Sequence, residues 1–297
     1  MAQVFQELWQ GKPQLDYEFS EQQQLLLDQN EQKLKTRGHY LSASIWYLGN
    51  WYWGLDRLDH LEHLLNSLGH NTQQPKIEFD KTYVNFCRSL PAKATSTPML
   101  LHPIELFFSI RSPYSHLALI RCIKLSRHYA VPLVIKPIVP MVMRGLTVPP
   151  NKKFYIFFDT KREAEKLGIN YGFVADPLGA GVRRCYALFD YAKSEGKEID
   201  YLLSYSQAVN AEGVLSDTDK GLKYIVERAD LNWNKAKAIL EDTDWANDWP
   251  RWTEKNEQEL KQLGLWGVPS IKYDNSIVWG QDRLEFVEQA IRKSTMN

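Results

Sequence analysis

The sequence has few cysteines, no surplus of either charge and no long apolar run. Its three cysteines, Cys87, Cys122 and Cys185, lie far apart and form no Cys-x-x-Cys pair, so neither a disulfide framework nor a zinc site is expected. Lys plus Arg and Asp plus Glu both number 36, so no overall charge favours nucleic acid or an anionic membrane. No apolar stretch approaches the roughly 18 residues of a spanning helix. The start, MAQVFQELWQ, has no basic segment followed by an apolar run, so no signal peptide is expected. We expect a cytoplasmic protein that binds neither nucleic acid nor membrane.

The sequence contains a long internal repeat. Residues 30–65, here called the first repeat, align without a gap to residues 256–291, the second repeat, with about 15 of 36 positions identical. Each repeat is predicted to contain the end of a helix, two short strands and a closing helix; the strands are Ser44–Tyr47 with Trp51–Trp53, and Ser270–Tyr273 with Ile277–Trp279. Self-similarity at such a long offset indicates a duplicated unit rather than a solenoid.

Only the second repeat is preceded by the rest of a domain. The segment 104–110 is predicted as a strand, 113–130 as a helix and 132–137 as a second strand, followed by helices at 151–167, 180–195, 200–210, 216–229 and 232–241. This order predicts an α/β thioredoxin fold with a large helical insertion at about 140–255. We expect three parts: a partial thioredoxin-like half-unit at 1–75, a linker at 76–100 and the thioredoxin domain at 101–297. The half-unit is either a shrunken duplicate or a remnant of a longer tandem protein.

The motif Ser112-Pro113-Tyr114-Ser115 stands where the first predicted strand of that domain meets its helix. Together with Val268-Pro269 and the following WGQDRL, it resembles the DsbA-like superfamily over about residues 103–292. The likeness is greatest to 2-hydroxychromene-2-carboxylate isomerases and kappa-class glutathione transferases. Disulfide oxidoreductases of this superfamily carry Cys-Pro-x-Cys at the turn. Because serine forms no disulfide and is a poor nucleophile without a base, redox catalysis here is excluded.

The resemblance implies that Ser112 stabilises the thiolate of bound glutathione. A helix N-terminus presents unpaired N–H groups and a partial positive charge, which stabilise an anion. The resemblance also implies a cis Pro269, with the backbone of Val268 pairing with glutathione as an added strand. The alternative for the motif is an ordinary helix cap, with Ser at the cap and Pro at the first helical position.

By the same resemblance, Gln281 and Asp282 grip the γ-glutamyl end of glutathione and Lys152 lies near the substrate. The first repeat keeps Asp56-Arg57 at the positions of Asp282-Arg283, so a structural role for that pair is the alternative. An ordinary surface lysine is the alternative for Lys152. Since the first repeat has no serine turn, any site is expected to belong to the second repeat alone.

Some features depart from the family pattern or carry weaker signals. Arg111 precedes the serine where relatives are usually apolar, and the loop 176–181 replaces the usual Pro-x-Asn stretch, so the isomerase's aromatic substrate is not assumed. His60 and His63 have a spacing that suits a metal, but they are interpreted as solvated helix positions. The tryptophans of 245–252 are predicted to pack in the core or between domains.

The sequence therefore favours a glutathione-dependent isomerase or transferase that acts on a small electrophile, aromatic or unsaturated, as its partner molecule. A non-catalytic thioredoxin-like binding module is the alternative. A homodimer in which the half-units complete each other is a further possibility.

Overall fold

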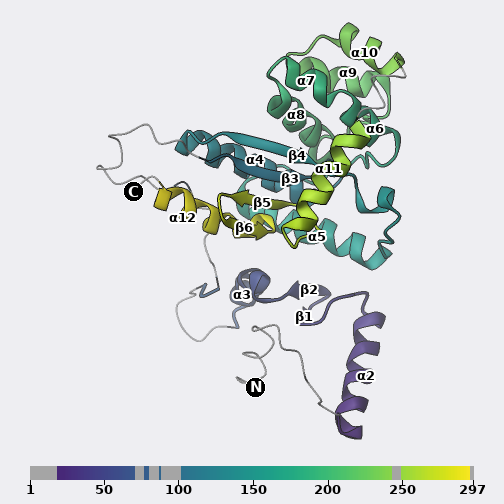
Figure 1. Ribbon diagram of the computed structural model, residues 1–297. Helices are drawn as coiled ribbons and strands as arrows, with labels where there is room; N and C mark the ends of the chain where they lie inside the picture. The colour runs from purple at the N-terminus through teal and green to yellow at the C-terminus, as the bar shows by residue number, and fades with distance from the viewer. Residues whose placement is uncertain (1–18, 71–76, 80–86, 88–101, 243–248, 295–297) are drawn as a thin grey trace.

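The computed structural model describes residues 19–70, 77–79, 87, 102–242 and 249–294 (Figure 1). Four strands form the central sheet: β3 (Ile104–Phe108), β4 (Leu133–Pro137), β5 (Ser270–Tyr273) and β6 (Ser276–Trp279). Their order is β4-β3-β5-β6, with β3 parallel to β4 and the other neighbours antiparallel. This is the sheet of the predicted thioredoxin fold.

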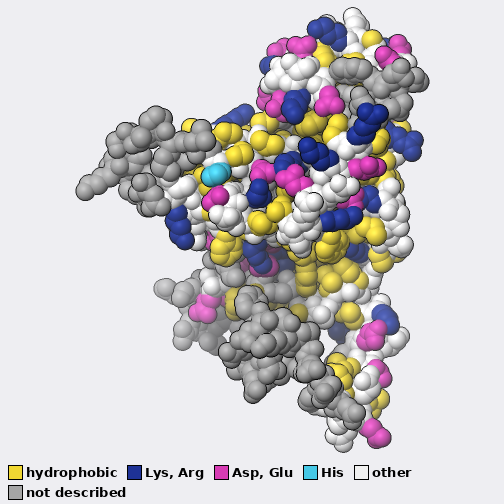
Figure 2. Space-filling view, in the orientation of Figure 1, with side chains coloured by type: hydrophobic (Ala, Val, Ile, Leu, Met, Phe, Trp, Pro, Cys, Tyr) yellow, Lys and Arg dark blue, Asp and Glu magenta, His cyan; other side chains and the backbone are white. Residues whose placement is uncertain are grey.

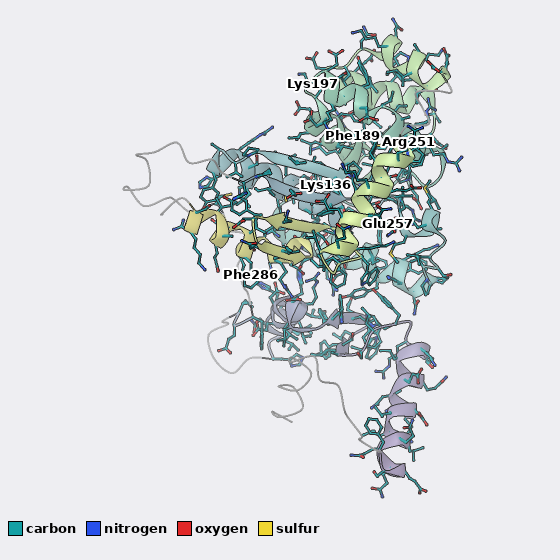
Figure 3. All side chains as sticks on the ribbon, viewed as in Figure 1. Lys136, Phe189, Lys197, Arg251, Glu257 and Phe286 are labelled. Carbon is teal, nitrogen blue, oxygen red and sulfur yellow. The ribbon has the colours of Figure 1, made fainter. Side chains whose placement is uncertain are left out.

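Helices cover both faces of this sheet because β3 alternates its side chains between two apolar clusters. Leu106 and Phe108 face the main core, which includes side chains of α4 (Pro113–Tyr129) and α12 (Leu284–Ser294). Phe107 faces the other way and packs with Leu260 of α11 (Trp249–Gln262). The period of two along a strand explains this division. Lys136 and Glu257 lie where α11 crosses the sheet (Figure 3).

The helical insertion follows β4. It contains the 3₁₀ turn η3 (Met141–Arg144) and six helices: α5 (Pro150–Leu167), α6 (Ala180–Ala187), α7 (Phe189–Ser194), α8 (Glu198–Ala211), α9 (Asp219–Arg228) and α10 (Trp233–Glu241). Helices α6 to α10 form a lobe above the sheet, whereas α5 lies on the opposite side, toward the first repeat (Figure 1). The fully buried Tyr186, Tyr201 and Tyr205 fill the lobe together with aliphatic side chains.

The first repeat forms a separate hairpin and helix. It consists of the end of α2 (Glu21–Thr36), β1 (Ser44–Tyr47), β2 (Asn50–Trp53), the 3₁₀ turn η1 (Leu55–Arg57) and α3 (Leu58–Ser67). In the second repeat, β5, β6, the 3₁₀ turn η5 (Gln281–Arg283) and α12 each begin 226 residues after their counterparts. A matching hydrogen bond of 2.9 Å closes each hairpin, from Gly54 N to Ala43 O and from Gly280 N to Pro269 O. Origin by duplication stays a prediction.

The predicted fold class is confirmed, with small differences in the elements. The strand predicted at 104–110 ends at Phe108, because Ser109 already accepts a hydrogen bond from the N–H of Ser112 in the following turn. The helix predicted at 180–195 is two helices that meet at Leu188. Most of the predicted linker, 76–100, lies outside the described residues. Among those that are described, no helix combines the length and the apolarity needed to cross a bilayer.

Candidate functional site

The serine turn begins α4. Ser112 is the N-cap, with φ −83° and ψ 117°, and its Oγ accepts a hydrogen bond of 3.2 Å from the backbone N–H of Ser115. Pro113 occupies the first helical position. The Ser112 side chain is partly exposed, and its hydroxyl hydrogen has no acceptor among the described residues. The hydroxyl can therefore still donate to a bound group.

The second serine of the motif has a different position. Ser115 is fully buried, and its Oγ accepts a hydrogen bond of 3.4 Å from the N–H of Ser109 at the end of β3. It ties the strand to the helix and faces no solvent. Of the two serines that stand at the cysteine positions of the oxidoreductases, only Ser112 can meet a ligand.

The loop before β5 lies at the same end of the sheet. Ser270 pairs with Phe107 in the antiparallel β3–β5 ladder, so the start of β5 adjoins the end of β3, from which the serine turn follows. The Val268–Pro269 peptide bond is cis. Val268 is partly buried, and within the described chain neither its N–H nor its C=O has a backbone hydrogen-bond partner. This backbone is available to an added strand.

Two departures from the family pattern contact each other. Arg111 donates two hydrogen bonds of 2.7 Å to the two carboxylate oxygens of Asp176, from Nε and from Nη2. Burial alone would raise the pKa of Asp176, but the bonds from Arg111 hold that pKa below its usual range. The pair links the serine turn to the loop after α5.

The remaining predicted site residues contact the first repeat directly or through Glu163, which lies beside Arg57. The amide Nε2 of Gln281 donates to Glu163 at 2.8 Å, its Oε1 accepts from Arg121 at 2.5 Å, and only 1% of Gln281 is exposed. Asp282 accepts a hydrogen bond of 2.9 Å from Arg57. Lys152 has its Nζ 5.6 Å from the ring centroid of Tyr40. A ligand that contacts Gln281 or Asp282 therefore has to share these groups with their present partners.

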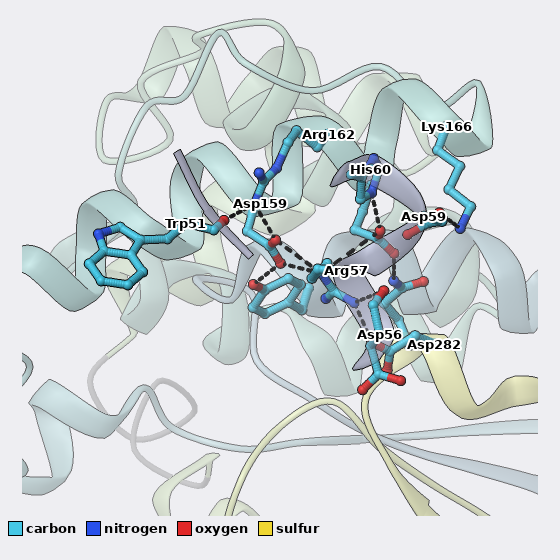
Figure 4. Close-up of polar contacts among 12 residues, drawn as sticks. Trp51, Asp56, Arg57, Asp59, His60, Asp159, Arg162, Lys166 and Asp282 are labelled. Atoms are coloured by element: carbon cyan, nitrogen blue, oxygen red, sulfur yellow. Dashed lines mark hydrogen bonds and ion pairs between the residues drawn. The ribbon is translucent and has the colours of Figure 1, made fainter. Parts of the chain in front are cut away.

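A buried polar network joins the first repeat to the thioredoxin domain (Figure 4). The Nε of Arg57 lies 2.9 Å from both carboxylate oxygens of Asp159, and its Nη1 lies 2.9 Å from Asp282 Oδ2. Glu163 is 3.9 Å away. Burial alone would lower the pKa of Arg57, but the three carboxylates outweigh it and raise that pKa. One guanidinium thus contacts three acids, and Arg162 adds a second ion pair of 2.9 Å to Asp159.

The two repeats bind each other through the same dipeptide. Arg57 of the first repeat pairs with Asp282 of the second, and Arg283 of the second pairs with Asp56 of the first at 2.6 Å. The contact is therefore reciprocal, as in a two-fold interface. Asp59 and Lys166 add a further bridge of 2.5 Å between α3 and α5.

These contacts correct two expectations. The surroundings of the turn do not belong to the second repeat alone, because the first repeat supplies Arg57. His60 is not solvated: it is partly buried, and its Nε2 lies 2.7 Å from Glu163, because α3 packs against α5. His63, one turn further along α3, is exposed as predicted. Trp249 and Trp252 pack on the core beside Tyr186, also as predicted, whereas Trp245 lies outside the described residues.

The geometry agrees with comparisons with known proteins. The sequence model of the DSBA-like thioredoxin domain matches residues 103–292. The chain belongs to this DsbA-like family. It is 25% identical over 197 residues to the 2-hydroxychromene-2-carboxylate isomerase of Pseudomonas putida, a match that covers 63% of this chain and 93% of the relative.

Solved structures show the same fold for the DsbA-like domain. A structure of 2-hydroxychromene-2-carboxylate isomerase superposes with a TM-score of 0.55 at 24% identity, over 64% of this chain and 95% of the other. A probable DsbA oxidoreductase from Streptomyces coelicolor gives a TM-score of 0.50 at 18% identity, over 65% and 89%. The first repeat lies before the matched residues, which begin at 103.

Sequence reasoning missed Arg57, Asp159 and Glu163. One signal was present: the Asp-Arg pair is retained in the first repeat, which has no serine turn. Asp159 and Glu163 are spaced i, i+4 on α5 and so share a face of that helix. This spacing alone does not indicate that the two acids are buried, because the cation that pairs with them comes from a distant part of the sequence.

Proposed function

We propose that the protein is a glutathione-dependent isomerase or transferase that acts on a small aromatic or unsaturated electrophile. The family of the domain and the similarity to an isomerase support the reaction class. The observation that carries the proposal is Ser112, a partly exposed residue whose hydroxyl caps the N-terminus of the 17-residue helix α4.

Ser112 supplies what a thiolate needs. Its Oγ accepts from Ser115, which leaves the hydroxyl hydrogen to donate to the sulfur of glutathione. The dipole of α4 adds positive potential at the same place. Together they lower the thiol pKa from about 8.5 toward neutrality and so supply a nucleophile at physiological pH. Val268, whose backbone N–H and C=O have no backbone hydrogen-bond partner within the described chain, lies in the loop beside the turn and can pair with the tripeptide backbone.

The chemistry follows from this thiolate. Its sulfur adds to an electrophilic carbon of the substrate, and the electron pair of the attacked double bond moves onto the conjugated acceptor group. Rotation about the new single bond and expulsion of the thiolate give an isomer, whereas protonation of the adduct gives a conjugate. Preorganised donors at the sulfur stabilise the charge that returns to it on expulsion.

The roles of Gln281, Asp282 and Lys152 in this proposal are secondary. Because Gln281 and Asp282 are held by Glu163, Arg121 and Arg57, the proposal depends on Ser112 and Val268 for the grip on glutathione. The γ-glutamyl end meets Asp282 only if Arg57 shares that carboxylate or withdraws from it.

The test is calorimetric titration of the whole chain with glutathione and with S-methylglutathione, which has no thiol to ionise. We expect wild type to prefer glutathione at mildly alkaline pH and Ser112→Ala to lose that preference. Ser126→Ala, at the other end of α4, is the matched control and should keep it. No heat of binding at millimolar glutathione would end the proposal.

One observation favours a second candidate, a non-catalytic binding module. The first repeat already occupies the carboxylate of Asp282, as a partner peptide would. This candidate predicts a protein that ignores glutathione and co-purifies with a protein partner. Glutathione turnover by the isolated chain would exclude it.

A further inference from the structure

Three carboxylates of the DsbA-like domain surround Arg57, which belongs to the first repeat and so lies outside that domain. The side chains of Asp159, Glu163 and Asp282 are 1%, 4% and 15% exposed, and that of Arg57 is 7% exposed. Removing one partner of a buried ion pair leaves an uncompensated charge, which is strongly unfavourable. The arrangement of these acids therefore depends on a residue of the first repeat.

Arg283 occupies the equivalent place in the second repeat and gives an internal comparison. Its side chain is 33% exposed and pairs with Asp56, which is 25% exposed. Partly exposed pairs of this kind contribute little to stability. The two arginines thus share sequence context and element position, and both approach Asp282, at 2.9 Å for Arg57 and 3.8 Å for Arg283. They differ in burial, and only Arg57 bonds to Asp159.

The network continues from Arg57 to the serine turn. The hydroxyl of Tyr114 donates a hydrogen bond of 2.6 Å to Asp159 Oδ2. Burial and the charge of Asp159 raise the pKa of Tyr114, so this hydroxyl stays protonated and remains a donor. Tyr114 lies in the first turn of α4, two residues after Ser112. A movement of the Asp159 carboxylate is therefore transmitted to the turn by the side chain of Tyr114.

Arg57 also fixes how Asp159 is oriented. Its Nε contacts both carboxylate oxygens, whereas Tyr155 and Arg162 bond only to Oδ1. Without Arg57, Asp159 loses the partner that bridges its two oxygens and keeps the two donors on Oδ1. The oxygen that holds Tyr114 is then bonded to Tyr114 alone among the described residues.

We propose that Arg57 is a positioning residue for the Ser112 turn, acting through Asp159 and Tyr114. The first repeat is in this sense part of the site, because it completes the charge balance that holds the turn in place. The proposal concerns the geometry of the turn and does not depend on which ligand binds there.

The test is hydrogen exchange of the full-length chain, read by mass spectrometry without glutathione. The N–H of Ser115 bonds to Ser112 Oγ and that of His116 to Ser112 O, so peptides that span 109–118 report on the turn. We expect Arg57→Ala to speed exchange there by about ten-fold or more. The matched variant Arg283→Ala should change it little. Helices α8 and α9 should keep wild-type exchange in both variants.

A chemical rescue separates positioning from general loss of stability. Low millimolar methylguanidinium should restore slow exchange at the turn of Arg57→Ala, because the cation fills the vacated place among the carboxylates. Equal concentrations of sodium chloride should not. Exchange that rises equally throughout Arg57→Ala, or a turn that stays as protected as in wild type, overturns the proposal.

A second variant keeps the test decisive if Arg57→Ala does not fold. Arg57→Lys keeps the charge but cannot bridge both oxygens of Asp159 while reaching Asp282. We expect Arg57→Lys to increase exchange at the turn by less than Arg57→Ala does, and Arg283→Lys to cause no such increase. Equal protection of the turn in Arg57→Lys and in wild type would contradict the role assigned to the guanidinium.

Discussion

At the scale of single residues, Glu163 shows how the buried network sets a charge. It accepts hydrogen bonds from His60 of the first repeat and from Gln281 of the second. Burial alone would raise its pKa, but the charge of Arg57 and the bond from His60 lower it from 4.5 to about 2. The folded protein therefore holds this carboxylate ionised at pH values where the unfolded chain protonates it.

This shift predicts an acid-sensitive fold. Because the folded pKa is the lower one, the stabilisation is complete above the unfolded pKa and is lost as the pH falls from about 5 to about 2, up to about 3 kcal/mol. Urea unfolding of wild type should become easier over this range. Glu163→Gln should show a shallower dependence, and the exposed neighbour Glu165→Gln should match wild type. Equal pH dependence in Glu163→Gln and wild type would contradict the assignment.

At the scale of elements, the serine at the start of α4 has two possible roles, and a single substitution can distinguish them. Ser112 is a good helix cap, and it is also the proposed donor to a thiolate. Aspartate caps helices as well as serine does and suits the dipole, but its charge repels a sulfur anion.

We therefore predict that Ser112→Asp keeps wild-type stability within about 1 kcal/mol and loses glutathione binding. Ser112→Ala should lose both, with about 1 kcal/mol of stability from the missing cap. Chemical denaturation and calorimetry on the same preparations measure the two effects. Glutathione binding by Ser112→Asp at wild-type affinity would leave Ser112 as a cap only.

The elements themselves were largely predictable from sequence. The repeat and its turn residues located both hairpins, and the five predicted insertion helices cover the six from α5 to α10, with one prediction spanning α6 and α7. The serine turn was found because proline and serine mark helix starts. The break at Leu188 was missed because the sequence there has no proline or glycine, and the backbone of Leu188 keeps right-handed helical angles. The cis bond at Pro269 came from the family resemblance rather than from local pattern.

At the scale of the whole molecule, the first repeat docks on the DsbA-like domain instead of standing apart. Figure 2 shows hydrophobic side chains gathered on the side of the domain that faces the first repeat. The first repeat also forms ion pairs with the domain, among them Arg57 with Asp282, Asp56 with Arg283 and Asp59 with Lys166. The two pairs between the repeats could not be predicted, since pairing between residues 225 and 227 positions apart leaves no local signal beyond the shared Asp-Arg dipeptide.

A charge swap tests the docking directly. Asp59, 2% exposed, pairs with Lys166 of α5. Asp59→Lys and Lys166→Glu each place like charges together in a poorly solvated contact, and each should cost about 3 kcal/mol. The double variant should recover most of that loss in thermal unfolding. Single variants that unfold like wild type would show that α3 does not lie on α5 in solution.

The account as a whole rests on a thiolate held at Ser112. The most direct measurement is the pKa of the glutathione thiol when bound, read by titrating the ultraviolet absorbance of the thiolate in the complex. We predict a value well below the roughly 8.5 of a free thiol, returning toward it in Ser112→Ala. A bound thiol that ionises as it does in water, or one whose pKa is the same in both proteins, would contradict the account.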